Sequence, residues 1–221
     1  MSNQRIVFKK EGKAKYISHL DLMRTMQRAF IRAGVTVKHT EGFNPHPYMV
    51  FALPLSVGAE SECEMMDFTL IGEDVTIENL PMHINRALPE GIMITEAYNT
   101  ERRFKEIVWL KVEGTLWYDT GLPEGAAEKL SSFFASEKIV MSKKTKSGIS
   151  DSDIKPCINA IDFKAADGKR ISVETVLTAQ NPSLNPEHLV GALRQLRPDI
   201  APDFAEFRRK AVYDKDMKIF R

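Results

Sequence analysis

The stretch SHLDLMRTMQRAFIRAG at residues 18–34 predicts an amphipathic helix, the clearest element of the chain, around which the first half of the fold is organised. Apolar side chains recur along it at the three- and four-residue spacing of one helical face. Ser18 is a favourable N-cap, and Asp21 three residues later forms a pattern similar to a capping box. Gly34 follows the last apolar position, as glycine does after many helices. We therefore expect a helix that begins after Ser18 and ends at Gly34.

Short β-prone segments on either side of this helix predict the rest of the first unit. We expect strands at 5–9, 35–38, 49–55, 62–70 and 92–97, and a second helix at 75–88. The same order returns later, with helices at 124–135 and 186–196, a polar loop at 143–152, and strands at 107–118, 138–141, 154–163, 170–177 and 206–213. The repeated order predicts an α+β protein of two tandem ferredoxin-like βαββαβ units with antiparallel sheets, each with an added strand, at residues 1–100 and 101–221.

The composition is that of an ordinary globular protein, but its charge is unevenly distributed. The 221 residues are 43% hydrophobic and 28% charged, and the formal net charge is +1. Residues 1–60 contain 9 Lys and Arg against 4 Asp and Glu, a net of +5. Residues 61–100 contain 1 against 8, a net of −7. We therefore expect any nucleic-acid contact to lie in the first unit, with the acidic neighbour competing for its cations.

Several classes of protein are excluded because their motifs are missing. Cys63 and Cys157 lie far apart, so the chain has no CxxC or CxxxCxxC cluster, and two thiols fit a reducing cytoplasm. The N-terminus lacks the apolar core of a signal peptide, and no run of about 18 apolar residues predicts a membrane span. No glycine-rich nucleotide-binding loop occurs. We expect a cytoplasmic protein without membrane contact and without a metal or cofactor of its own.

A row of arginines on the first helix is the strongest candidate binding feature. Arg24, Arg28 and Arg32 recur every four residues and therefore share one helix face. Neighbouring guanidinium groups repel one another, and phosphate, which arginine binds through two hydrogen bonds, is a natural partner. Lysines of the preceding loop extend this predicted anion-binding surface, namely Lys10, Lys13 and Lys15. The alternative is a solvated helix face whose arginines pair with the acids of residues 61–100.

Two further segments carry candidate site residues. The N–H groups after Ser18 form the positive end of the helix dipole, where His19 is placed to donate to a phosphate or act as a general base. The loop EGFNPHP at 41–47 contains two prolines and is therefore not helical, so Asn44 and His46 lie on a rigid loop suited to recognition. His19 and His46 are the candidate catalytic residues, and each has an ordinary alternative role in local packing. The histidines lack the helical spacing of a metal site, so we expect no metal.

These segments together resemble one family. The similarity lies in KYISHLDLMR at 15–24, Arg28, Arg32-Ala-Gly34, EGFNPHP at 41–47, FALPLSVG at 51–58 and SECEMMD at 61–67. The combination is similar to the radical-SAM-linked proteins of bacteria. The similarity is specific over residues 9–70 and only general beyond residue 100. The resemblance implies an accessory chain, of unassigned biochemistry, encoded beside or fused to a radical SAM protein. The iron–sulfur cluster and S-adenosylmethionine would belong to that partner, because this chain lacks the CxxxCxxC motif.

The expected function is that of an accessory or substrate-binding protein that acts with a radical SAM enzyme. We expect it to bind RNA, either tRNA or rRNA, through the basic helix. One alternative is a metal-independent ribonuclease, similar to repeat-associated RNA-binding proteins, with His19 or His46 as the acid–base group. A second is a protein-interaction module without nucleic-acid binding, and a third is a site for a small phosphorylated metabolite. The sequence favours a chain without enzymatic activity of its own. It does not identify the substrate or the oligomeric state.

Overall fold

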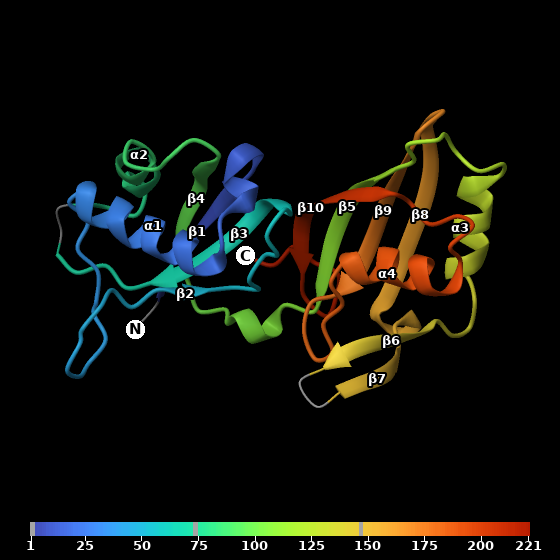
Figure 1. Ribbon diagram of the computed structural model, residues 1–221. Helices are drawn as coiled ribbons and strands as arrows, with labels where there is room; N and C mark the ends of the chain where they lie inside the picture. The colour runs from blue at the N-terminus through green and yellow to red at the C-terminus, as the bar shows by residue number, and fades with distance from the viewer. Residues whose placement is uncertain (1–2, 73–74, 146–147) are drawn as a thin grey trace. The chain divides into compact units, whose positions relative to one another are not determined.

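The predicted first helix is present in the computed structural model of the protein, and antiparallel strands lie beside it (Figure 1). The structure describes residues 3–72, 75–145 and 148–221. The chain divides into unit 1, which is Met1–Phe104 with Arg221, and unit 2, which is Lys105–Phe220. Both units combine helices with antiparallel strands, which confirms the predicted α+β class.

Unit 1 is an antiparallel sheet with two α-helices packed on it. Its elements are β1 (Asn3–Lys10), the 3₁₀ helix η1 (Gly12–Tyr16), α1 (His19–Arg32), β2 (Val50–Phe51), β3 (Glu60–Phe68), α2 (Leu80–Asn85) and β4 (Ile92–Thr100). The strands lie in the order β4-β1-β3, and β2 pairs with β3 through Val50 opposite Asp67 and Phe51 opposite Met66. The first strand of the unit is therefore central, between its last strand and β3.

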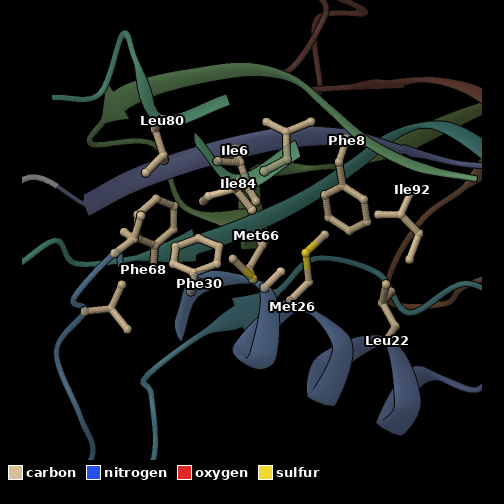
Figure 2. Packing of buried hydrophobic residues seen from close by; sticks show 14 of the residues in the cluster. Ile6, Phe8, Leu22, Met26, Phe30, Met66, Phe68, Leu80, Ile84 and Ile92 are labelled. Carbon is tan, nitrogen blue, oxygen red and sulfur yellow. The ribbon is translucent and has the colours of Figure 1, made fainter. Parts of the chain in front are cut away.

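The core of unit 1 forms where the apolar face of α1 meets the sheet (Figure 2). Alternation along β1 directs Ile6 and Phe8 into this core, and both are completely buried. The Phe30 ring of α1 packs edge-on against Phe68 of β3, with 5.1 Å between the ring centroids. The helix contributes four buried side chains, Leu22, Met26, Ala29 and Phe30. Burying each large side chain stabilises the fold by roughly 1.5–3 kcal/mol, so this contact fixes which face of α1 remains in solvent.

The ends of α1 are formed as predicted. The Ser18 hydroxyl oxygen accepts a hydrogen bond from the Asp21 N–H at 3.1 Å, and the hydroxyl donates to the Asp21 carboxylate at 2.7 Å. Ala33 is the C-cap, and Gly34 follows it with φ of +71°, a left-handed conformation that glycine adopts without a steric penalty. The predicted cap and stop are therefore confirmed.

Unit 2 combines antiparallel strands with two α-helices and contains a separate hairpin. Its elements after η2 (Phe104–Glu106) are β5 (Trp109–Trp117), α3 (Ala126–Phe134), β6 (Val140–Thr145), β7 (Gly148–Asp153), η3 (Lys155–Cys157), β8 (Ile158–Asp167), β9 (Arg170–Thr178), α4 (Glu187–Leu196) and β10 (Phe204–Tyr213). The order of its main strands is β10-β5-β9-β8, and all neighbours are antiparallel. β6 and β7 form a separate two-stranded sheet.

The second helix is shorter than predicted, because the expected helix at 75–88 is reduced to Leu80–Asn85. Thr76 and Asn79 form turns before it, and Asn79 is its N-cap. Pro81 lies in the first turn, where the missing N–H of proline is tolerated, so the helix begins beside it rather than passing through it.

Two strands predicted near the recognition loop are also shorter. Within the described residues, 35–38 forms only an isolated bridge between Val37 and Leu70, and the strand at 49–55 is reduced to β2. Leu53 has φ of +42° and Pro54 has no N–H to donate, so regular pairing does not continue past them.

The polar segment 143–152, predicted as a loop, is instead part of the β6–β7 hairpin, although Lys146 and Ser147 lie outside the described residues. Its side chains lack apolar alternation, so the sequence pattern does not indicate strands. Backbone pairing and a tertiary contact stabilise the hairpin: Gln195 of α4 accepts from the Ser142 N–H and donates to the Ser142 carbonyl, each at 3.0 Å. A long-range contact therefore outweighs the weak local propensity.

Candidate anion-binding site

Packing of α1 leaves its arginine row in solvent. Arg24, Arg28 and Arg32 are all exposed, whereas the core side of the helix is buried. The four-residue spacing is close to one helical turn, so successive guanidinium groups lie along one side of the helix. The outer face of α1 is therefore strongly positive.

A surface hollow of about 640 Å³, termed the arginine hollow, lies where the C-terminal parts of α1 and α2 meet. Its lining residues are Thr25, Arg28, Arg32, Ala33, His83, Arg86, Ala87, Leu88 and Pro89. Three of these residues are arginines, which stay protonated at every physiological pH, and none is acidic. The arginine hollow thus gathers positive charge from two segments that are far apart in the sequence.

The arginines of the row have different local partners. Arg32 donates to the Ala87 carbonyl at 2.6 Å and so links the end of α1 to the segment after α2. Arg24 lies outside the arginine hollow and contacts Asp21 at 3.5 Å. Across the described residues, Arg28 and Arg86 take part in no ion pair. These two guanidinium groups therefore face the hollow with their charge uncompensated by a neighbouring carboxylate.

The described acids of segment 61–100 form no ion pair with these arginines. Asp67 binds Arg5, and Glu96 contacts Arg221. Glu64 is buried in β3. In the part of the chain that the structure describes, no acid of this segment pairs with an arginine of the row. The alternative, in which these acids pair with the arginines of the helix, is therefore not observed among the described residues.

Of the three predicted lysines, Lys10 does not lie on the surface. Only 1% of Lys10 is exposed, and its ammonium group donates to the carbonyls of Lys15 at 3.2 Å and Ile17 at 3.3 Å. Its assignment to an exposed anion-binding surface is therefore corrected: Lys10 holds η1 against the end of β1. Lys13 is exposed, and Lys15 is half-buried with its ammonium group 5.3 Å from the centre of the Tyr16 ring.

The residues at the start of α1 have structural contacts. The Ser18 hydroxyl is engaged in the cap with Asp21. The half-buried His19 ring packs edge-on against Phe51 of β2, with 5.4 Å between the centroids. This contact is the local packing role that was the ordinary alternative for His19.

The loop that carries Asn44 and His46 is exposed, and hydrogen bonds join its two arms. Figure 1 shows it projecting from the segment between α1 and β2. The Thr40 N–H donates to the His46 carbonyl at 2.9 Å, and the His46 N–H donates to the Thr40 hydroxyl at 3.2 Å. No hydrogen bond or ring contact within the described ranges joins His46 to His19. The structure therefore shows the two candidate catalytic histidines in separate local environments.

Two residues of the arginine hollow, His83 and Arg86, were not predicted as site residues. They lie three residues apart at the end of α2, a spacing that puts them on one helix side, and Arg86 is the single basic residue of the acidic segment. A single arginine in an otherwise acidic segment is a sequence signal that could have identified Arg86 as a candidate site residue. Its proximity to Arg28 and Arg32 depends on the packing of α2 beside α1, which periodicity does not reveal.

In residues 3–72, 75–145 and 148–221, no group of three or more His, Cys, Asp or Glu side chains is arranged to hold a metal ion. None of the described helices is long and apolar enough to cross a membrane. Neither Cys63 nor Cys157 forms a disulfide bond in the described structure.

The fold is similar to solved structures of low sequence identity. A chain in the crystal structure of a Cbf5–Nop10–Gar1 complex matches with a TM-score of 0.53 and 8% identity, over 95% of this chain and 48% of that one. A chain of the archaeal box H/ACA sRNP Nop10–Cbf5 complex matches with a TM-score of 0.49 and 9% identity, over 93% and 46%. The protein thus spans about half the length of these chains, and the first likeness concerns the fold alone.

A family assignment comes from the sequence itself. No curated protein matches the chain. Residues 4–186 match the family described as "Uncharacterized protein conserved in bacteria (DUF2344)". This match covers nearly all of unit 1, including the arginine hollow, and most of unit 2. The chain therefore belongs to the bacterial DUF2344 family.

Proposed function

We propose that this protein is an RNA-binding accessory protein that acts with a radical SAM enzyme, and that the arginine hollow is its phosphate-binding surface. The single observation that carries the proposal is the convergence of Arg28, Arg32 and Arg86 on one open hollow with no acidic lining residue. An RNA backbone supplies the phosphates that such a hollow attracts, and tRNA and rRNA are the expected classes of ligand.

The chemistry of guanidinium groups supports a phosphate ligand. Each guanidinium presents several N–H donors in a planar fork that matches two phosphate oxygens. The hollow is open rather than enclosed, which suits a polymer backbone passing through it. Contacts of this type fix the position of a nucleic acid without reading its sequence, so specificity must come from other residues.

The fold supports a surface of this kind. We propose that both units are ferredoxin-like, because their strands follow one order when they are numbered within each unit with the β6–β7 hairpin left out: fourth, first, third, second. In unit 1 this order packs α1 and α2 on one sheet face, which brings their C-terminal ends together at the arginine hollow.

The proposed enzyme partner rests on the sequence resemblance in residues 9–70. This chain has two cysteines and no cluster motif, so a radical SAM reaction would need the partner's iron–sulfur cluster. Co-expression with the radical SAM protein encoded nearest to it tests this part. Recovery of both chains in one size-exclusion peak is expected, and separate elution at micromolar concentration would remove the partnership from the proposal.

The RNA-binding part is tested by fluorescence anisotropy with labelled bacterial tRNA and an rRNA fragment at low salt, for the protein alone and with its partner. Arg28→Glu and Arg86→Glu are the informative variants, because neither side chain has an ion pair among the described residues whose loss would disturb the fold. Each should weaken RNA binding by roughly 10-fold or more, because it removes a phosphate contact and adds a repulsive charge. Lys129→Glu, an exposed position on α3 of unit 2, is the matched control.

Three possible results distinguish the proposed RNA site from its alternatives. Loss of affinity in the two arginine variants and not in the control supports the proposal. If both arginine variants bind RNA with wild-type affinity, RNA binds elsewhere on the protein and the hollow is not its site. Absence of RNA binding by the wild-type protein, together with protection of the hollow by a nucleoside monophosphate, would instead assign it to a small phosphorylated metabolite.

A further inference from the structure

Phe43 is the most exposed large apolar side chain in the described part of the protein. Its relative exposure is 111%, whereas the relative exposure of Phe204, the other exposed phenylalanine, is 56%. The ring therefore touches essentially nothing in its own chain. An aromatic ring in this position gains no packing energy from the fold, so both of its faces are available to a ligand.

The loop that presents Phe43 is held in shape by its own hydrogen bonds. The Tyr48 N–H donates to the Lys38 carbonyl at 2.8 Å, and Thr40 and His46 are joined by two further bonds. His39 and Pro47 form an isolated bridge between the two arms of the loop. The aromatic tip is therefore presented by a closed loop, which reduces the entropy lost when a ligand binds.

The groups around Phe43 are polar and suited to base edges. Asn44 is exposed, and its side-chain amide offers both donors and an acceptor. The His46 Nδ1 lies 3.2 Å from the Asn44 carbonyl, which can only accept. The Thr40 hydroxyl lies 3.2 Å from the same nitrogen, so Nδ1 is engaged within the loop and Nε2 is the ring nitrogen that remains for a ligand. An isolated ring beside these groups resembles a stacking platform more than the broad apolar patch of a protein interface.

We propose that Phe43 stacks on an unpaired nucleobase, with Asn44 and His46 contacting the edge of that base. The ligand class is thereby narrowed to RNA with single-stranded nucleotides, such as a loop, bulge or end. This inference rests on the proposed function: the arginine hollow holds phosphates, and the Phe43 loop of the same unit selects unpaired bases. Aromatic stacking of this kind tolerates any base, so discrimination between bases depends on the two polar neighbours.

The test uses the full chain and two labelled RNAs of equal length, a single-stranded oligouridylate and a perfect duplex. Phe43→Ala and Phe43→Leu should weaken binding of the single strand by roughly 10- to 100-fold, because stacking on one base contributes that much. Leucine keeps apolar area without a π-face, so its loss of affinity separates stacking from hydrophobic contact. Phe204→Ala is the matched control for an exposed phenylalanine in unit 2. Duplex binding should be unchanged in all three variants.

Phe43→Trp supplies a direct optical readout. Its indole emission, measured as the difference from wild-type protein, should be quenched by the single strand and not by the duplex. Wild-type affinity of Phe43→Ala for the single strand, with loss of binding in Arg28→Glu, would overturn this inference and leave the proposed function standing. Unchanged RNA affinity of Phe43→Ala with loss of the radical SAM partner would also overturn it, since the ring would then dock on protein. If wild-type protein binds no RNA, both proposals fail.

Discussion

At the scale of single residues, unit 1 depends on a buried charge in its first strand. Arg5 lies opposite Asp67 in the β1–β3 ladder, and its guanidinium donates to both carboxylate oxygens, at 2.7 and 2.9 Å. It also donates to the Arg102 carbonyl at 2.7 Å and lies 4.3 Å from the centre of the Phe104 ring. Such a pair adds little net stability over an apolar replacement, but losing one partner leaves a buried charge.

Asp67→Asn is therefore expected to lower the free energy of unfolding by about 3 kcal/mol, because the Arg5 charge loses its counter-ion. Urea unfolding followed by circular dichroism measures the change. Asp162→Asn is the control, since Asp162 pairs with Lys164 on the surface and should contribute below about 1 kcal/mol. Equal effects of the two substitutions would contradict the assignment of Arg5 as a buried ion-pair partner.

Tyr118 provides a pH-dependent test in unit 2. Burial, with a smaller contribution from the charge of Asp203, raises the pKa of Tyr118 to about 12, and the hydroxyl donates to the Ile200 carbonyl at 3.0 Å. An unfolded tyrosine has a pKa near 10, so this contribution to stability is complete below pH 10 and lost as pH rises toward 12. Its size is about 2 kcal/mol. Tyr118→Phe should abolish this part of the alkaline loss of stability in urea unfolding at pH 9 to 11.5; parallel curves for both proteins would contradict the raised pKa.

At the scale of elements, α1 links the core to the candidate site. Its buried face, with Met26 and Phe30 at 0% and 1% exposure, anchors the helix on the sheet. Its outer face carries the arginine row, and its last turn donates through Arg32 to the segment after α2. Loss of order in α1 would therefore disturb the arginine hollow before it disturbed unit 2.

The N-cap of α1 is directly testable. Ser18→Ala should lower the free energy of unfolding by about 1 kcal/mol, because the Asp21 N–H loses its acceptor. Ser18→Thr keeps a hydroxyl acceptor and should retain most of that stability. Thermal unfolding of the three proteins under one condition compares them, and indistinguishable midpoints for wild type and Ser18→Ala would show that the cap bond contributes nothing.

At the scale of the whole molecule, charge is segregated rather than absent. The net charge is +1, yet the excess of cations lies in residues 1–60. Three acids of the following segment are engaged elsewhere: Asp67 and Glu96 pair with Arg5 and Arg221, and Glu64 is buried. The electrostatic attraction of an anionic polymer should therefore come from a few local contacts and not from the field of the entire protein.

The salt dependence of RNA binding measures that distinction. Each phosphate contact with a single strand contributes roughly −0.7 to the slope of log K against log salt concentration. Arg28→Ala should therefore make the slope less negative by about 0.7. The control Lys129→Ala in unit 2 should leave the slope unchanged, and an equal change in both variants would mean that binding follows net charge alone.

Local patterns were sufficient to predict much of this fold. The Ser18 cap, the apolar face of α1 and the stop at Gly34 all depend on residues close in sequence, and the structure contains each of them. The sequence also predicted the arginine row, because helical geometry alone places every fourth residue on one side.

Only the tertiary structure decided what those residues face. It buried Lys10 under η1, formed the β6–β7 hairpin from a polar segment with help from Gln195, and brought Arg86 beside Arg28. Each outcome depends on which distant elements pack together. The energy of such contacts is set by the strand order and by shared burial, and no window of consecutive residues contains that information. The sequence by itself therefore determined where positive charge is carried, and the packing of α2 against α1 determined that three of the arginines line one hollow.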